Sequence, residues 1–130
     1  MKTEKVIKKV CKEVQDLLIK KNKDYGDSAL NPSNVFSKGD VFESLGSRIG
    51  DKLMRIQNVG VCDETEDTIL DLIGYLILYK SAMIMERDKV YNEEKDFIEN
   101  GGHLSVNGRM LSTVDDLDIY YSEKEEENGN

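Results

Sequence analysis

The 130-residue chain is long enough for one domain, and 38% of its residues are hydrophobic while 34% are charged. Its net charge of −8 is unevenly distributed, because residues 115–130 contain seven carboxylates and one lysine while the rest is nearly neutral. A nearly neutral folded part argues against a protein that binds long nucleic acid through broad contact with the phosphate backbone.

The cysteines and the N-terminal segment bear on the compartment. Cys11 and Cys62 are far apart and accompany a single histidine, so a cysteine–histidine metal cluster is excluded and two reduced thiols are expected. The segment MKTEKVIKKV has no apolar signal core, and no uncharged run reaches the roughly 18 residues of a transmembrane helix. We therefore expect a cytoplasmic protein with no membrane partner.

Two helices separated by a long loop are predicted in the first half of the chain. Apolar residues spaced by three and four predict a helix over residues 3–21. Residues 22–39 are rich in Asn, Asp, Gly and Ser and hold the only proline, which predicts a loop. Asp40, with Glu43 three residues later, predicts the start of a second helix over about residues 41–58, which Gly60 ends.

A third and more apolar helix is predicted from about Glu64 to Glu86, or as far as Asn100, because Asp63 and Glu66 repeat the capping pattern. Its middle, ILDLIGYLILY, is apolar nearly all round, which is typical of a central, buried helix. A lone small bundle covers such a helix poorly, so we expect a homo-oligomer, either a dimer or a tetramer.

The remaining residues predict a small extension. Asn107-Gly108 in the centre of residues 104–111 indicates a two-stranded hairpin. Residues 115–130 have the composition of a solvated or partner-dependent tail. The sequence thus predicts a mainly all-α protein: an antiparallel helix bundle over residues 1–100, a β-hairpin extension over 101–114 and an acidic tail over 115–130.

Carboxylates on the third helix are the first candidates for chemistry. Asp67 and Asp71 are four residues apart and share a helix face, which continues through Gly74 and Tyr75. Asp71 stands between two leucines, and a buried carboxylate needs a cation, a donor or a metal. A pair with a basic residue of the second helix, ligation of Mg²⁺ or substrate, and plain exposure all remain open. Gly74 leaves room for a close approach.

The second helix offers a mainly cationic face. Arg48, Asp51, Lys52 and Arg55 recur at helical spacing, so three cations surround one carboxylate. Such a face suits a phosphate chain, with Asp51 orienting an arginine or reaching a metal. The alternative is an exposed face whose charges pair with one another.

The loop over residues 20–34 provides base-recognition chemistry. Asn22 and Asp24 can read the edges of a base or sugar, Tyr25 can stack on a base, and Lys23 adds a positive charge. Gly26 permits a positive φ. Turn formation alone explains much of this composition, but beside two charged helices the segment predicts a lid.

Three ordered blocks carry a family resemblance: KNKDYGDS at 21–28, SRIGDKLMR at 47–55 and DETEDTILDLIGY at 63–75. They resemble the nucleotide modification-associated domain family common in phages. The helical layout also resembles the MazG-like all-α nucleoside triphosphate pyrophosphohydrolases, which hold Mg²⁺ with carboxylates from two neighbouring helices. The ExxE pair of those enzymes is incomplete here, because Gly46 follows Glu43 three residues later.

Residues and resemblance together lead to a nucleotide-binding protein of phage type. The leading hypothesis is a Mg²⁺-dependent nucleoside triphosphate pyrophosphohydrolase, in which Asp67 and Asp71, with Glu64 or Asp51, bind the metal. Its nucleotide would be held by residues of the loop and the two helices: Asn22, Lys23, Asp24, Tyr25, Arg48, Lys52, Arg55 and Tyr75. A protein that sequesters a host nucleotide signal without cutting it is the second hypothesis, and a structural or adaptor protein is the third.

Overall fold

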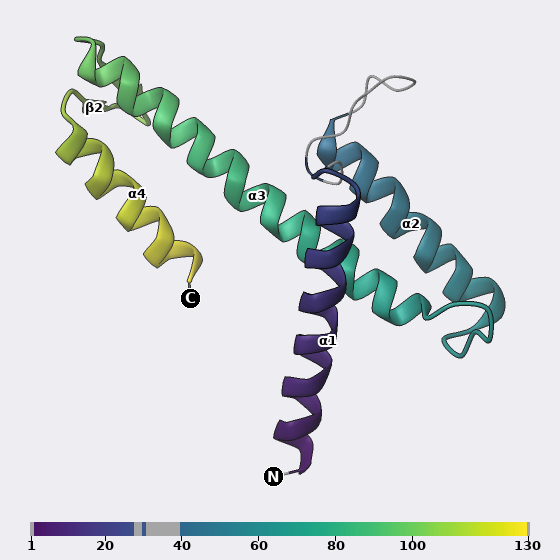
Figure 1. Cartoon of the computed structure of the whole chain (residues 1–130). Coiled ribbons are helices and arrows are strands. Elements are labelled where there is room, and N and C mark those ends of the chain that lie inside the picture. Colours follow the sequence, from purple (N-terminus) through teal and green to yellow (C-terminus); the bar gives the residue numbers. More distant parts are fainter. Residues whose placement is uncertain (1, 28–29, 31–39, 130) are drawn as a thin grey trace. The chain divides into compact units, whose positions relative to one another are not determined.

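The computed structural model describes residues 2–27, 30 and 40–129, which form helices and one short hairpin (Figure 1). The helices are α1 (Lys2–Asp24), α2 (Val41–Val59), α3 (Thr68–Glu99) and α4 (Val114–Asn128). The strands are β1 (Leu104–Val106) and β2 (Arg109–Leu111). The predicted class, mainly α-helical with a small hairpin, is therefore confirmed.

The chain divides within α3 into two compact units, residues 1–83 and 84–130. This boundary precedes the predicted one at residue 100, because the last turns of α3 pack with the hairpin and α4. Charge follows the same division, since the first unit holds 13 basic and 13 acidic residues while the second holds 5 and 13. The whole net charge thus belongs to the second unit.

Helix α1 continues one turn beyond its predicted end and stops in a glycine cap. Gly26 has φ of 60° and Asp27 has φ of 65°. The Asp27 N–H donates to the Asn22 carbonyl at 2.9 Å, a bond typical of a Schellman motif. Residues 22–24, predicted to open the loop, are therefore helical. Most of that loop lies outside the described residues.

Helix α2 has the predicted ends. The Glu43 N–H donates to Asp40 Oδ1 at 2.8 Å, which caps the N-terminus. Gly60, with φ of 84°, closes the C-terminus by donating its N–H to the Ile56 carbonyl. In Figure 1, α2 and the first part of α3 run in opposite directions, and α1 crosses them steeply. Among the three helices of the first unit, α2 and α3 thus have the antiparallel arrangement predicted for the bundle, whereas α1 does not.

Helix α3 begins at Thr68, four residues later than predicted. The Asp67 side chain accepts the Leu70 N–H at 2.9 Å, and its carbonyl accepts the Asp71 N–H at 3.0 Å, so Asp67 is the N-cap. The predicted cap, Asp63, is instead engaged by Arg55. Because the capping pattern at Asp63 lies upstream of the apolar run, it predicted a start of α3 that is too early in the sequence.

One side of α3 is exposed within the first unit. Ile69, Leu76 and Met83 recur every seven residues and are 40%, 51% and 48% exposed. The expectation that this helix is buried all round is therefore wrong for the single chain. Among the described residues α3 also has the length and composition of a membrane-crossing helix, with 17% of its apolar window buried. A core helix of an oligomer has the same properties.

The second unit has a small core of its own, formed by Ile98, Leu111 and Leu117. The hairpin is confirmed: Leu104 pairs with Leu111 and Val106 with Arg109, around a turn in which Asn107 and Gly108 both have positive φ.

The segment predicted as a solvated or partner-dependent tail is helical, because residues 114–128 form α4. Thr113 and Asp116 make a capping box at its start, and Leu117 is fully buried. Val114, Leu117, Tyr120 and Tyr121 supply an apolar face at helical spacing. The high content of carboxylates concealed this periodicity.

Candidate functional site

A cavity of about 300 Å³ lies in the first unit, among α1, α2 and α3. This volume is at the lower end of the range for small-molecule sites. Four leucines provide an apolar wall, and charged, amide and phenolic groups provide the rest. The lining residues are Leu17, Leu18, Lys21, Asn22, Tyr25, Arg48, Leu70, Asp71, Gly74, Tyr75 and Leu78.

Five of the residues predicted to bind metal or nucleotide meet at this cavity: Asn22, Tyr25, Arg48, Asp71 and Tyr75. They come from three elements, and the glycine cap of α1 explains part of their placement. Because Gly26 turns the chain directly after the helix, Asn22 stays on the last helical turn while Tyr25 follows it. Tyr25 is 70% exposed, so its ring belongs to the rim.

Gly74 allows α1 to approach α3. A Cβ added at Gly74 would lie 3.2 Å from Leu18 Cδ2, closer than ordinary van der Waals contact. The prediction that Gly74 leaves room for an approach is confirmed, and the approaching group is a side chain of α1. This contact closes the apolar end of the cavity.

Arg48 presents a cation to the cavity beside an aromatic ring. Its guanidinium carbon lies 5.9 Å from the centre of the Tyr75 ring, at the outer limit of a cation–π contact. Within the described part of the chain Arg48 makes no ion pair, and neither does Lys21. Two cations at this cavity therefore retain their capacity to bind an anion.

Lys52, by contrast, is fully engaged. Its Nζ lies 2.9 Å from Glu66 Oε1 and 3.0 Å from Asp71 Oδ2. The hydrogen bond to Glu66 raises the pKa of Lys52, partial burial opposes that rise, and Asp71 adds to it. Of the interpretations open for Asp71, the structure shows the pair with a basic residue of the second helix.

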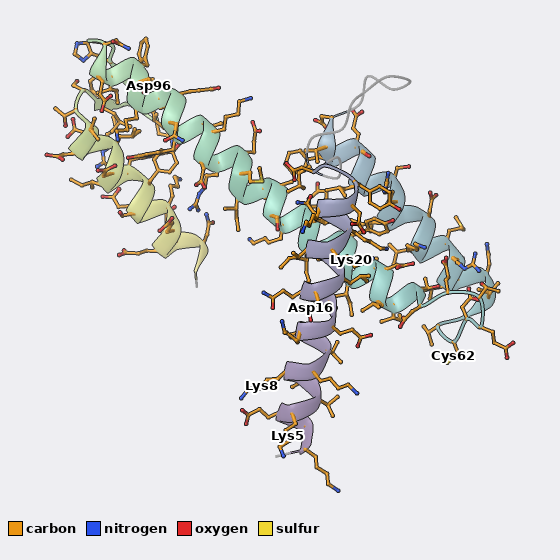
Figure 2. The ribbon with its side chains drawn as sticks, viewed as in Figure 1. Lys5, Lys8, Asp16, Lys20, Cys62 and Asp96 are labelled. Atoms are coloured by element: carbon orange, nitrogen blue, oxygen red, sulfur yellow. The ribbon has the colours of Figure 1, made fainter. Side chains whose placement is uncertain are left out.

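Arg55 is engaged in the connection between α2 and α3, which Figure 2 marks at Cys62. Its Nε donates to Asp63 Oδ2 and lies 3.1 Å from Glu66 Oε1. Asp63 also accepts two hydrogen bonds from Thr65. These donors, Arg55 foremost, hold the pKa of Asp63 far below its ordinary value. Arg55 thus fixes the connection and does not line the cavity.

The other predicted residues also lie outside the cavity lining. Asp24 pairs with Lys20 at 3.3 Å on α1, whose Lys5, Lys8 and Lys20 side chains are labelled in Figure 2. Lys23, Asp51 and Glu64 are exposed, and Glu64 precedes α3 instead of lying on it. Asp67 serves as the N-cap.

The proposed ligands for Mg²⁺, Glu64, Asp67 and Asp71, are not brought together. In the part of the chain that the structure describes, no three His, Cys, Asp or Glu residues are grouped so that they could share an ion. Carboxylates near the cavity are instead paired with Lys52 and Arg55. Among the described residues, the three proposed Mg²⁺ ligands therefore do not form one cluster.

Sequence reasoning missed several contributors. Lys21 begins the first motif block but was not selected, although it lines the cavity. Asp63 and Glu66 were read as helix caps, whereas they hold Arg55 and Lys52. The sequence signal for these ion pairs was the presence of opposite charges on the two sides of the α2–α3 connection.

Comparison of the chain with protein-family models, curated proteins and solved structures finds no match. The resemblance in the three sequence blocks therefore stays an expectation. Support for a function comes from the residues and the geometry of the cavity.

Proposed function

We propose that the first unit binds a nucleotide in the cavity among α1, α2 and α3. The observation that carries this proposal is that Lys21 and Arg48, two cations without an ion pair among the described residues, line one cavity with Tyr25 and Tyr75. A phosphate needs the first kind of group and a base the second.

Each lining group has a role in this proposal. Arg48 binds a phosphate through its fork of N–H donors, and Lys21 adds a second charge. The ring of Tyr25 closes over the base from the rim, while Asn22 donates to and accepts from a base or sugar edge. The leucines exclude water from the inner end.

Binding without cleavage is the form of this function that the geometry favours. Lys52 and Arg55 form ion pairs with three carboxylates, Asp63, Glu66 and Asp71. A paired carboxylate is a poorer metal ligand than a free one, because the ion must first displace the cation. The chain would then act by sequestering its nucleotide.

Mg²⁺-dependent hydrolysis of a nucleoside triphosphate is the second candidate. One observation favours it: Glu66 and Asp71 both contact Lys52 Nζ, so their oxygens lie near one another. If Lys52 moved away, these two carboxylates could share one ion.

Isothermal titration with a panel of nucleotides, run beside a phosphate-release assay with Mg²⁺, tests both candidates. Binding without release supports sequestration, whereas release that requires Asp71 supports hydrolysis. Arg48→Ala should weaken binding about tenfold or more. The matched control is Arg109→Ala, because Arg109 lies on β2 and pairs with Glu123 outside the cavity. Absence of binding to every nucleotide would reject the proposal.

A further inference from the structure

We infer that the cavity selects a nucleotide carrying a single phosphate over the corresponding triphosphate. This inference rests on the proposed function and concerns which nucleotide the same site takes. It follows from how the basic residues of α2 are shared between the cavity and the protein's own carboxylates.

The basic residues on the cationic face of α2 differ in whether they form ion pairs with acidic residues. Lys52 and Arg55 together make four ion-pair contacts with acidic residues at distances from 2.5 to 3.1 Å. Asp63, the chief partner of Arg55, is only 7% exposed at its side chain. A phosphate chain could bind these two cations only if their ion pairs with the protein's carboxylates were broken. Breaking them is strongly unfavourable, because partly or largely buried carboxylates would lose their partners.

Arg48, one turn before Lys52, stands apart from this network. It lines the cavity with Lys21 from α1, and neither is paired within the described residues. The cavity therefore offers two positive charges to a ligand. A phosphate monoester carries a charge of about −1.5 to −2 near neutral pH, which these two cations match.

Further phosphates would meet an unfavourable environment. The Asp71 carboxylate lines the same cavity, and its side chain is 25% exposed. Each added phosphate brings negative charge toward this group, and the described lining of the cavity holds no cation beyond Lys21 and Arg48 to balance it. Space acts in the same direction, because about 300 Å³ is small for a base, a sugar and an extended phosphate chain.

The test is isothermal titration of the full chain with three ligands for each common base: the nucleoside, its 5′-monophosphate and its 5′-triphosphate. Each series is run once with EDTA and once with Mg²⁺. We expect the monophosphate to bind about tenfold or more tightly than the nucleoside, and more tightly than the triphosphate in either buffer.

Two variants separate the cations. Arg48→Ala should remove the preference for monophosphate over nucleoside, whereas Arg55→Lys should keep that preference, because Arg55 lies outside the cavity lining and the change retains a positive charge opposite Asp63. Circular dichroism spectra confirm that each variant is folded.

The possible results separate the preference for a monophosphate from the proposed nucleotide binding on which it rests. Equal or tighter binding of the triphosphate, with or without Mg²⁺, overturns the inference and leaves nucleotide binding intact. Equal binding of nucleoside and monophosphate also overturns it. If none of the compounds binds, the proposed function itself fails.

Discussion

The Nζ atom of Lys52 lies 3.0 Å from Asp71 Oδ2, so a cation of α2 neutralises the carboxylate in the apolar run of α3. The same Nζ contacts Glu66 at 2.9 Å. Both side chains of the Lys52–Asp71 pair are largely shielded from solvent, at 18% and 25% exposure. This pair links two helices and leaves Arg48 as the cation of α2 that faces the cavity.

Asp71→Asn should lower the free energy of unfolding by about 1 kcal/mol, because Lys52 keeps Glu66 when it loses the charge of Asp71. Urea unfolding followed by circular dichroism measures this change. Combining it with Lys52→Met completes a double-mutant cycle, in which the two losses should be less than additive. Strictly additive losses would show that the pair is not coupled in solution.

The pH dependence of stability should report Asp63. Arg55, with Thr65, holds the pKa of Asp63 below its ordinary value of 3.8. Because the folded-state pKa is lowered, the ionised carboxylate stabilises the fold above that value, and this stabilisation is lost progressively as pH falls below it. Melting temperatures between about pH 7 and about pH 2 should therefore fall less steeply for Asp63→Asn than for the unmodified chain. Identical slopes would contradict the pairing with Arg55.

Leu117→Ala should destabilise the second unit by about 2–4 kcal/mol, because Leu117 is fully buried against Ile98 and Leu111. Hydrogen exchange should show lost protection in the hairpin and α4, with smaller changes in α2. Ile119→Ala is a matched control, since Ile119 lies two residues further along α4 and is 51% exposed. Equal effects of the two changes would be inconsistent with the packing described.

The expected homo-oligomer is proposed to form through the exposed side of α3, with a second copy as the occupant. Lys80 and Glu86 are both exposed and stand three residues before and after Met83. In two antiparallel copies of α3 that cross at Met83, each lysine meets the other copy's glutamate, and Leu76 meets Val90. A parallel pair would set like charges together.

Met83→Cys tests this arrangement in a chain that also carries Cys11→Ser and Cys62→Ser. Mild oxidation should yield a covalent dimer, because residues at a two-fold axis lie next to their own copies. Leu76→Glu in the same background should prevent it. A chain that stays monomeric in light scattering, or one that sediments with phospholipid vesicles instead of pairing, would contradict the proposal.

Local signals predicted the helices and the hairpin well. Asp40 with Glu43, Gly60 and Asn107-Gly108 each specify backbone geometry over a few residues, and the structure has each of them. Such signals failed where a side chain had a distant alternative, as when Asp63 bonded Arg55 instead of capping α3. They also failed for α4, where seven carboxylates concealed the apolar spacing around Leu117.

The candidate site was predictable in part. Asn22, Tyr25, Arg48 and Tyr75 could be chosen by chemistry, since aromatic, amide and guanidinium groups suit a nucleotide. Which cations of α2 would remain free could not be deduced, because helical spacing places Arg48, Lys52 and Arg55 on one face without specifying their partners. That division depends on how the α2–α3 connection folds back, which is a tertiary property.

The most direct test of nucleotide binding is an NMR titration of the ¹⁵N-labelled chain with nucleoside monophosphates. Nucleotide binding in the cavity should produce saturable shifts of backbone amides at the end of α1, around Arg48 and around Tyr75. Amides of residues 101–129 should stay unperturbed by the same additions. Shifts confined to that second region, or none with any nucleotide at millimolar concentration, would contradict a nucleotide site among α1, α2 and α3.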